Sequence, residues 1–168
     1  MDIRRILLIG MVFMVVLLGG CRVENEDDIE SKEAAVTCVE ESGDSIAELY
    51  AICVDNNIKW IRIADESDIL DWAVNIAYDD KYYLISTPEG NSADPTNTVF
   101  LRGCEILGQL NSHYSIDSVR YFSDKSIEIC FSNNSRAIMY SPESLPHKDL
   151  NAEKITDGFY TYMLKPMF

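Results

Sequence analysis

Few side chains in this sequence have the types and the spacing that catalysis requires. The two histidines, His113 and His147, lie outside any recognisable metal-binding or nucleophile motif. The segment 43–47 partly matches a nucleophile elbow around Ser45, but Ala47 stands where that motif requires a glycine. The sequence also has no glycine-rich loop that could hold a phosphate. We therefore expect a protein that is not an enzyme and that needs no metal or other cofactor.

A group of tyrosines around two carboxylates is a candidate interface. Asp79 and Asp80 are adjacent at a predicted connection between a helix and a strand, and Tyr78, Tyr82 and Tyr83 lie beside them. Tyrosine is enriched at interaction hot spots. The alternative is that the tyrosines pack in the core with their hydroxyls at its edge, and that the two aspartates are solvated.

The first twenty residues have the features of a secretion signal. Arg4 and Arg5 precede an apolar run, 6–18, that is interrupted only by Gly10. This run is shorter than the roughly 20 residues that a membrane-spanning helix needs. The small residues Gly19 and Gly20 follow it and indicate a cleavage site.

The segment Leu18-Gly19-Gly20-Cys21 resembles the lipobox of bacterial lipoproteins, and the resemblance is confined to residues 1–21. It implies that the signal peptide 1–20 is removed and that Cys21 becomes an N-terminus carrying a diacylglyceryl group and usually a further acyl chain such as palmitate. Two or three acyl chains make a stable membrane anchor, whereas one chain binds only marginally. Arg22 in place of aspartate points to the outer membrane, facing the periplasm, in a Gram-negative cell. The alternatives are an ordinary secreted protein and an uncleaved anchor helix.

Four further cysteines allow two disulfides in an oxidising cell envelope. Proximity in sequence favours the pairs Cys38 with Cys53 and Cys104 with Cys130, and buried reduced thiols are the alternative. The chain has no C-x-x-C pair, so we expect neither a thioredoxin-like redox pair nor a zinc knuckle.

The chain is strongly acidic, with a formal net charge of −14 at pH 7. This charge disfavours nucleic acid as a partner and would attract a basic protein, although solubility alone is a sufficient explanation. Acidic residues dominate the segment 22–35, which predicts a solvated tether between Cys21 and the folded part. We expect three regions: the signal peptide 1–20, the lipidated cysteine and tether 21–35, and a single domain over 36–168.

The periodicity of that domain predicts an α+β fold, in which two or three helices pack on an antiparallel sheet with a C-terminal β-meander. A capping box at Ser45 predicts the start of the first helix, and Asp94-Pro95 predicts the start of the last. The expected helices are 45–55, 65–77 and 94–111, and the expected strands are 58–63, 81–87, 116–122, 126–132, 136–141 and 159–164. Within the central strand of the meander, Ile127, Ile129 and Phe131 should face the core.

Size, charge and predicted location together suggest a noncatalytic protein-binding module that is anchored to the envelope membrane through lipid on Cys21. One concrete form of this hypothesis is an immunity protein against a secreted antibacterial toxin. The alternative is a structural or accessory lipoprotein of an envelope assembly.

Overall fold

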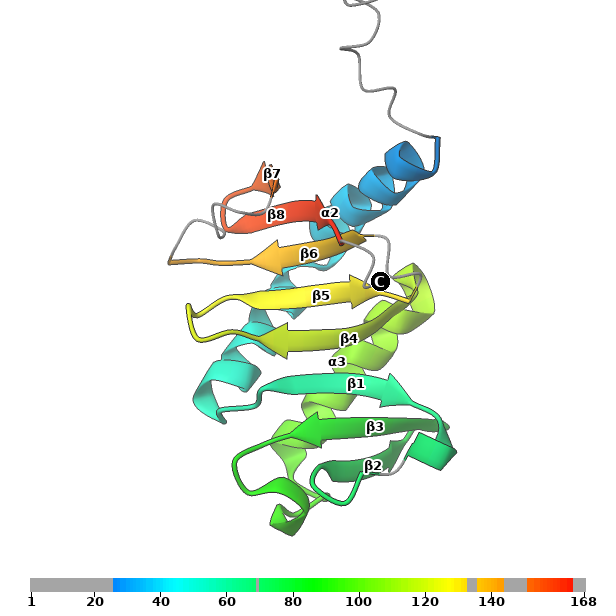
Figure 1. Ribbon diagram of the computed structural model, residues 1–168, viewed down its shortest axis with the longest axis vertical. Coiled ribbons are helices and arrows are strands. Elements are labelled where there is room, and N and C mark those ends of the chain that lie inside the picture. Colours follow the sequence, from blue (N-terminus) through cyan, green and yellow to red (C-terminus); the bar gives the residue numbers. More distant parts are fainter. Residues whose placement is uncertain (1–25, 69, 133–135, 144–150, 165–168) are drawn as a thin grey trace, which may run out of the picture. The chain divides into compact units, whose positions relative to one another are not determined.

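Figure 1 shows the computed structural model of the chain, which describes residues 26–68, 70–132, 136–143 and 151–164. The chain divides into two compact units, 1–30 and 31–168. In the second unit, eight strands form one sheet, and helices α2 and α3 lie on one of its faces (Figure 1). The helices are α2 (Glu26–Asp55), the 3-10 helices η1 (Glu66–Asp68) and η2 (Gly90–Ser92), and α3 (Thr98–Tyr114). The strands are β1 (Trp60–Ala64), β2 (Val74–Tyr78), β3 (Lys81–Ser86), β4 (Ile116–Tyr121), β5 (Ile127–Phe131), β6 (Arg136–Tyr140), β7 (Glu153–Thr156) and β8 (Phe159–Met163).

The sheet is antiparallel throughout, with the strand order β2-β3-β1-β4-β5-β6-β8-β7. The run from β4 onward is the predicted C-terminal meander, and two helices pack on the sheet, so the α+β class is confirmed. Strand β1 is inserted between β3 and β4, which both come later in the chain.

The two faces of the sheet differ because side chains alternate along each strand. Ile127, Ile129 and Phe131 of β5 belong to the main hydrophobic core together with residues of α2 and α3, as the sequence predicted. Glu128 and Cys130 point to the opposite face, which we call the helix-free face.

Helix α2 begins well before the predicted start. The acidic segment 26–35 is helical instead of forming a tether, and Ala35 is fully buried in the main core. Its apolar stripe explains this result, because Cys38 and Val39 continue the spacing of the buried Ile46. The predicted capping box at Ser45 lies inside α2, just after a break in helical geometry at Ser42 (φ −131°, ψ 15°). The capping signal therefore corresponds to a kink within the helix.

The expected helix over 65–77 is wrong, because the chain forms the short η1 and then strand β2. Strand β2 pairs with β3 in a hairpin whose turn residues, Asp79 and Asp80, have φ values of 49° and 58°. A two-residue type I′ turn requires positive φ at both positions, and aspartate tolerates it better than most residues do.

The last helix, α3, begins and ends three or four residues later than predicted. Its N-cap is Asn97, whose Oδ1 accepts a hydrogen bond from the backbone N–H of Val99 (2.9 Å). The edge strand β7 was not expected from the sequence.

Candidate functional site

The four described cysteines are free, buried thiols, so the preferred disulfide pairing is wrong. Cys38 and Cys53 both lie in α2, about 22 Å apart along the helix, whereas a disulfide needs Cα atoms within about 7 Å. Cys104 of α3 belongs to the main core, whereas Cys130 lies on the helix-free face, where its Sγ is 3.5 Å from Glu128 Oε1. The structure shows the alternative expectation instead, in which these cysteines are buried and reduced.

Burial removes these thiols from nucleophilic chemistry. Desolvation raises the pKa of each cysteine to about 12, so the reactive thiolate form is scarce at neutral pH. For Cys130, the neighbouring Glu128 carboxylate raises the pKa further.

The structure separates the tyrosines that the sequence placed in one candidate interface. Tyr83 is 1% exposed in the main core, and Tyr78 packs against the same core. Tyr82 points to the opposite face, and a hydrogen bond with Glu66 raises the pKa of its hydroxyl. The core-packing alternative therefore describes two of the three tyrosines. Asp79 and Asp80 are exposed in the hairpin turn.

Of the other residues that were named from the sequence, the structure describes His113 but not Cys21 or His147. His113 is exposed near the C-terminal end of α3, with its Nδ1 2.8 Å from the carbonyl oxygen of Gln109. Cys21 and His147 lie outside the described residues. Within the described ranges, no group of three or more potential ligands could hold a metal ion. No helix in this part of the chain is both long enough and apolar enough to span a bilayer.

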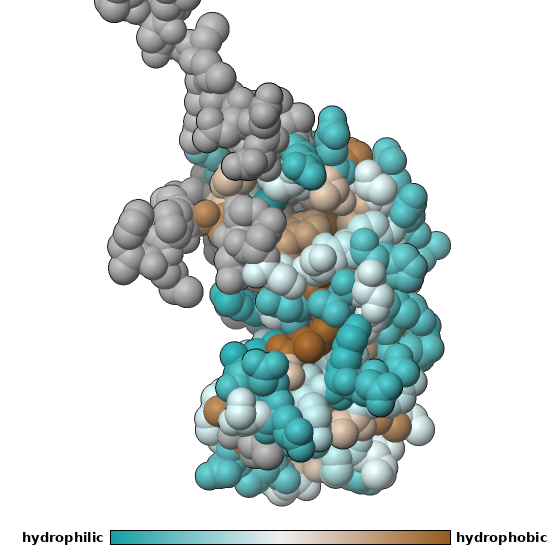
Figure 2. Space-filling model, turned by 90° about the vertical axis from the view of Figure 1, so that its right-hand side faces the viewer, coloured by the Kyte–Doolittle hydropathy of each residue, from teal (hydrophilic) through white to brown (hydrophobic). Residues whose placement is uncertain are grey.

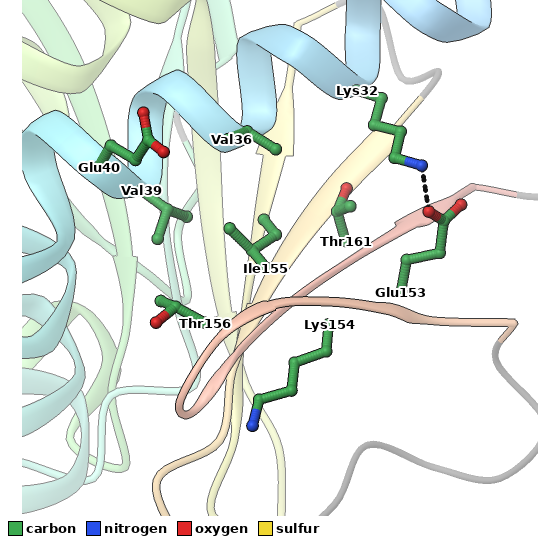
Figure 3. Close-up of a pocket in the computed structure, with 9 residues that line it drawn as sticks. All are labelled: Lys32, Val36, Val39, Glu40, Glu153, Lys154, Ile155, Thr156 and Thr161. Carbon is green, nitrogen blue, oxygen red and sulfur yellow. Dashed lines mark ion pairs between the residues drawn. The ribbon is translucent and has the colours of Figure 1, made fainter.

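A groove of about 450 Å³ lies between the first half of α2 and the β7–β8 hairpin (Figure 3). Val36, Val39 and Ile155 project into it from its two sides, and an ion pair between Lys32 and Glu153 crosses one end. Glu40 and Lys154 also line the groove, so it combines a small apolar surface with charges of both signs.

The centre of the helix-free face is a buried polar network around Glu128, which is 5% exposed. Its carboxylate accepts a hydrogen bond from the hydroxyl of Tyr162 and is 3.5 Å from Nη1 of Arg120 on β4. Burial, followed by the contact with Glu128, raises the pKa of Tyr162. The network pairs its own members, so it stabilises this face without leaving a group free for chemistry.

A different arrangement occupies the β1 end of the same face, which we call the tryptophan–arginine patch (Trp60, Arg62 and Trp72). Trp60 and Arg62 are two residues apart on β1 and so share a face, and Arg62 Cζ is 5.8 Å from the centroid of the Trp60 ring. Trp72, from the loop before β2, meets Trp60 edge to face with centroids 5.5 Å apart. The side chain of Trp72 is 56% exposed, so the patch is open to solvent.

Arg62 is unusual among the basic residues of this chain. Its Nε is buried and has no hydrogen-bond partner, and Arg62 forms no ion pair with any described residue. Every other lysine or arginine in the described ranges has a hydrogen bond or an ion pair. These residues are Lys32, Lys59, Lys81, Arg102, Arg120, Lys125, Arg136 and Lys154.

The patch was not predicted from the sequence. The spacing of Trp60 and Arg62 in a predicted strand was sufficient to place them on one face. Trp72 falls within the expected helix 65–77, which does not form, so its proximity to Trp60 was missed.

The surface seen from the right-hand side of Figure 1 is largely hydrophilic, and its hydrophobic groups lie in small, separate areas (Figure 2).

No family model matches the chain, and no curated protein and no solved structure shows significant similarity to it.

Proposed function

We propose that this chain is a lipid-anchored lipoprotein of the cell envelope that acts as a noncatalytic protein-binding module through the tryptophan–arginine patch. A specific form of the proposal is an immunity protein that neutralises a secreted antibacterial toxin. The observation that carries it is the exposed ring of Trp72, which meets Trp60 edge to face. Tryptophan and arginine are the residues most enriched at the centres of protein interfaces.

The position of the patch supports this proposal. Residues 31 and 32, where the second compact unit begins, contact the other end of the sheet: Ser31 lies 3.3 Å from Arg136 on β6, and Lys32 pairs with Glu153 on β7. Five strand spacings separate β7 from β1, which corresponds to about 24 Å across the sheet. Ser31 and Lys32, at the start of the second unit, therefore lie at the opposite end of this sheet from the patch.

The charge of α2 suits recruitment of a basic partner. Its solvent side carries exposed carboxylates along its length, at Glu33, Glu40, Glu41, Asp44, Glu48 and Asp55. Of these, Glu48 is paired with Arg102, at 2.8 Å. Such a field accelerates the approach of a basic protein without specifying the contact that holds it.

Affinity purification tests the proposal directly. The tagged full-length protein, expressed in its native host and extracted with detergent, should retain a protein partner in stoichiometric amount, and Trp72→Ala should lose it. Met163→Ala is the matched control, because Met163 is the other large hydrophobic side chain exposed among the described residues (46%) and lies on β8. Recovery of no stoichiometric partner, or equal recovery with Trp72→Ala, would refute the proposal.

A phenotype distinguishes the immunity hypothesis from an accessory role in an envelope assembly. Deletion of the gene should sensitise cells to a toxin-producing competitor and leave a pure culture intact. Loss of envelope integrity in a pure culture would instead support the accessory role.

A further inference from the structure

Arg62 has a buried Nε without a hydrogen bond and forms no ion pair with any described residue, which points to a ligand that the isolated chain lacks. A buried donor without an acceptor is unfavourable, and such groups are rare in folded proteins. Water does not satisfy Nε, because this atom is shielded from solvent. The residue as a whole is only half-buried, so a ligand can still approach its side chain.

A shortage of acidic residues does not explain why Arg62 has no ion-pair partner, because the chain has 28 acidic and 14 basic residues. Four acids lie between β1 and β2, at Asp65, Glu66, Asp68 and Asp71. None of them bonds to Arg62, and Glu66 bonds to Tyr82 instead. The fold thus leaves one cation unpaired in a place where the local sequence could easily have supplied its partner.

We propose that Arg62 binds a carboxylate of the partner protein, and that the aliphatic or aromatic neighbours of this carboxylate pack against Trp60 and Trp72. This inference rests on the proposed function and adds the chemistry of the contact. The two Nη groups of the guanidinium can donate parallel hydrogen bonds to a planar carboxylate, while the buried Nε stays out of reach of a ligand. The ring of Trp60 next to Arg62 keeps water from one side of that ion pair.

The surrounding charge favours a single carboxylate over a polyanion. The acids of the β1–β2 connection and the net charge of −14 repel phosphodiester chains and anionic lipid surfaces. A side-chain or C-terminal carboxylate brings one charge, which Arg62 neutralises, on a chain whose apolar atoms suit the tryptophan rings.

A local carboxylate contact is compatible with a partner that is basic overall. The acidic field of α2 acts over a Debye length, about 8 Å at physiological ionic strength, and sets the rate of encounter. The contact with Arg62 acts at hydrogen-bond distance and sets the rate of dissociation. We therefore expect one acidic residue at the centre of a basic surface on the partner.

The two tryptophans of the chain, Trp60 and Trp72, both lie in the patch, so intrinsic tryptophan fluorescence reports on this site without a label. The full-length lipidated protein in a non-ionic detergent is titrated with acetyl-Leu-Glu-Leu-amide, acetyl-Leu-Gln-Leu-amide and inorganic phosphate. The glutamate peptide should change the fluorescence in a saturable manner and bind at least about tenfold more tightly than the other two probes.

Two variants with the same change in net charge locate the effect. Arg62→Gln should remove the preference for the glutamate peptide. Arg102→Gln, on α3 where Arg102 pairs with Glu48, should leave the preference unchanged. A glutamine peptide or phosphate that binds as tightly as the glutamate peptide, the absence of any saturable change, or an unchanged preference in Arg62→Gln overturns the inference.

The same variants separate this inference from the proposed function. If Arg62→Gln still recovers the protein partner while Trp72→Ala loses it, the carboxylate contact is wrong and the binding module stands. If the peptide preference is present but the native host yields no partner, the site is real and the proposed function fails.

Discussion

At the scale of single residues, Arg62 should lower the stability of the isolated fold. We expect Arg62→Met to raise the free energy of unfolding by about 1 kcal/mol, because an unsatisfied buried donor costs about 1–3 kcal/mol and the cation–π contact with Trp60 returns only part of it. Urea unfolding followed by circular dichroism measures the change.

The control for this prediction is Arg120→Met, which should change stability in the opposite direction. Arg120 faces the carboxylate of Glu128, whose side chain is 7% exposed. Removing the cation from a buried carboxylate lowers stability, here by about 1 kcal/mol because Arg120 itself is largely solvated. A loss of stability in Arg62→Met comparable to that in Arg120→Met would show that Arg62 is a structural residue.

The four buried thiols give the fold a sensitivity to alkali. Burial raises their pKa from 9.0 to about 12, so between these values the folded chain holds protons that the unfolded chain releases. The free energy of unfolding should thus be at its plateau below about pH 9 and fall as the pH rises toward 12. Urea titrations at pH 7 and pH 10.5 test this, with iodoacetamide labelling at pH 8 as a check that the native thiols react only after unfolding. Equal stability at the two pH values would contradict the assigned burial.

At the scale of elements, the contact between α3 and β3 depends on a glycine. A Cβ atom at Gly108 would lie 2.6 Å from the hydroxyl oxygen of the buried Tyr83. We expect Gly108→Ala to lower the unfolding free energy by about 1 kcal/mol, because the clash outweighs the better helix propensity of alanine. In a Tyr83→Phe background, the clashing oxygen is absent and the same change should raise stability by about 1 kcal/mol. Thermal unfolding of the four proteins of this cycle measures the coupling, and additive effects would mean that the contact does not constrain α3.

The elements that were predicted from sequence alone are those whose apolar residues recur with a single spacing. In β5, Ile127, Ile129 and Phe131 alternate with Glu128 and Cys130, and short polar segments in the sequence separate β4, β5 and β6, so local pattern was sufficient. Strand β2 was missed because Ala73, Ile76 and Ala77 have helical spacing, whereas Val74 and Ile76 have strand spacing. Pairing with β3 through the Asp79–Asp80 turn makes this segment a strand.

Two other errors come from reading polar residues as unstructured. The acidic segment that ends at Ala35 was assigned to a tether, although Ala35 is buried in the main core and Ala34 packs against it. Strand β7 is polar because it is the edge of the sheet, and exposed charges such as Glu153 and Lys154 are typical of edge strands.

The candidate site was harder to predict than the fold. Sequence can place Trp60 and Arg62 on one strand face, but the absence of a partner for Arg62 depends on where every other acid ends up. For the same reason, sequence alone left open whether the tyrosines around Asp79 form an interface or pack in the core, since the burial of Tyr83 depends on helix α3 lying over it.

At the scale of the whole molecule, the proposed anchor can be tested independently of the partner. Cys21→Ser should move the protein from the membrane fraction to the soluble envelope fraction, because the acyl chains supply the proposed attachment. Mass spectrometry of the wild-type protein should find an N-terminal Cys21 carrying two or three acyl chains. An intact leader on the wild-type protein, or membrane retention of Cys21→Ser, would rule out this anchor.

The contacts of Ser31 and Lys32 also constrain the order in which the parts of the domain can fold. Their partners, Arg136 and Glu153, lie more than 100 positions further along the chain, in the last strands of the sheet. A polypeptide that emerges with its N-terminus first, from a ribosome or a translocation channel, therefore cannot dock the beginning of α2 until nearly all of it has emerged. Until that moment the beginning of α2 lacks these partners, so a chaperone that binds exposed segments would have most time to act there.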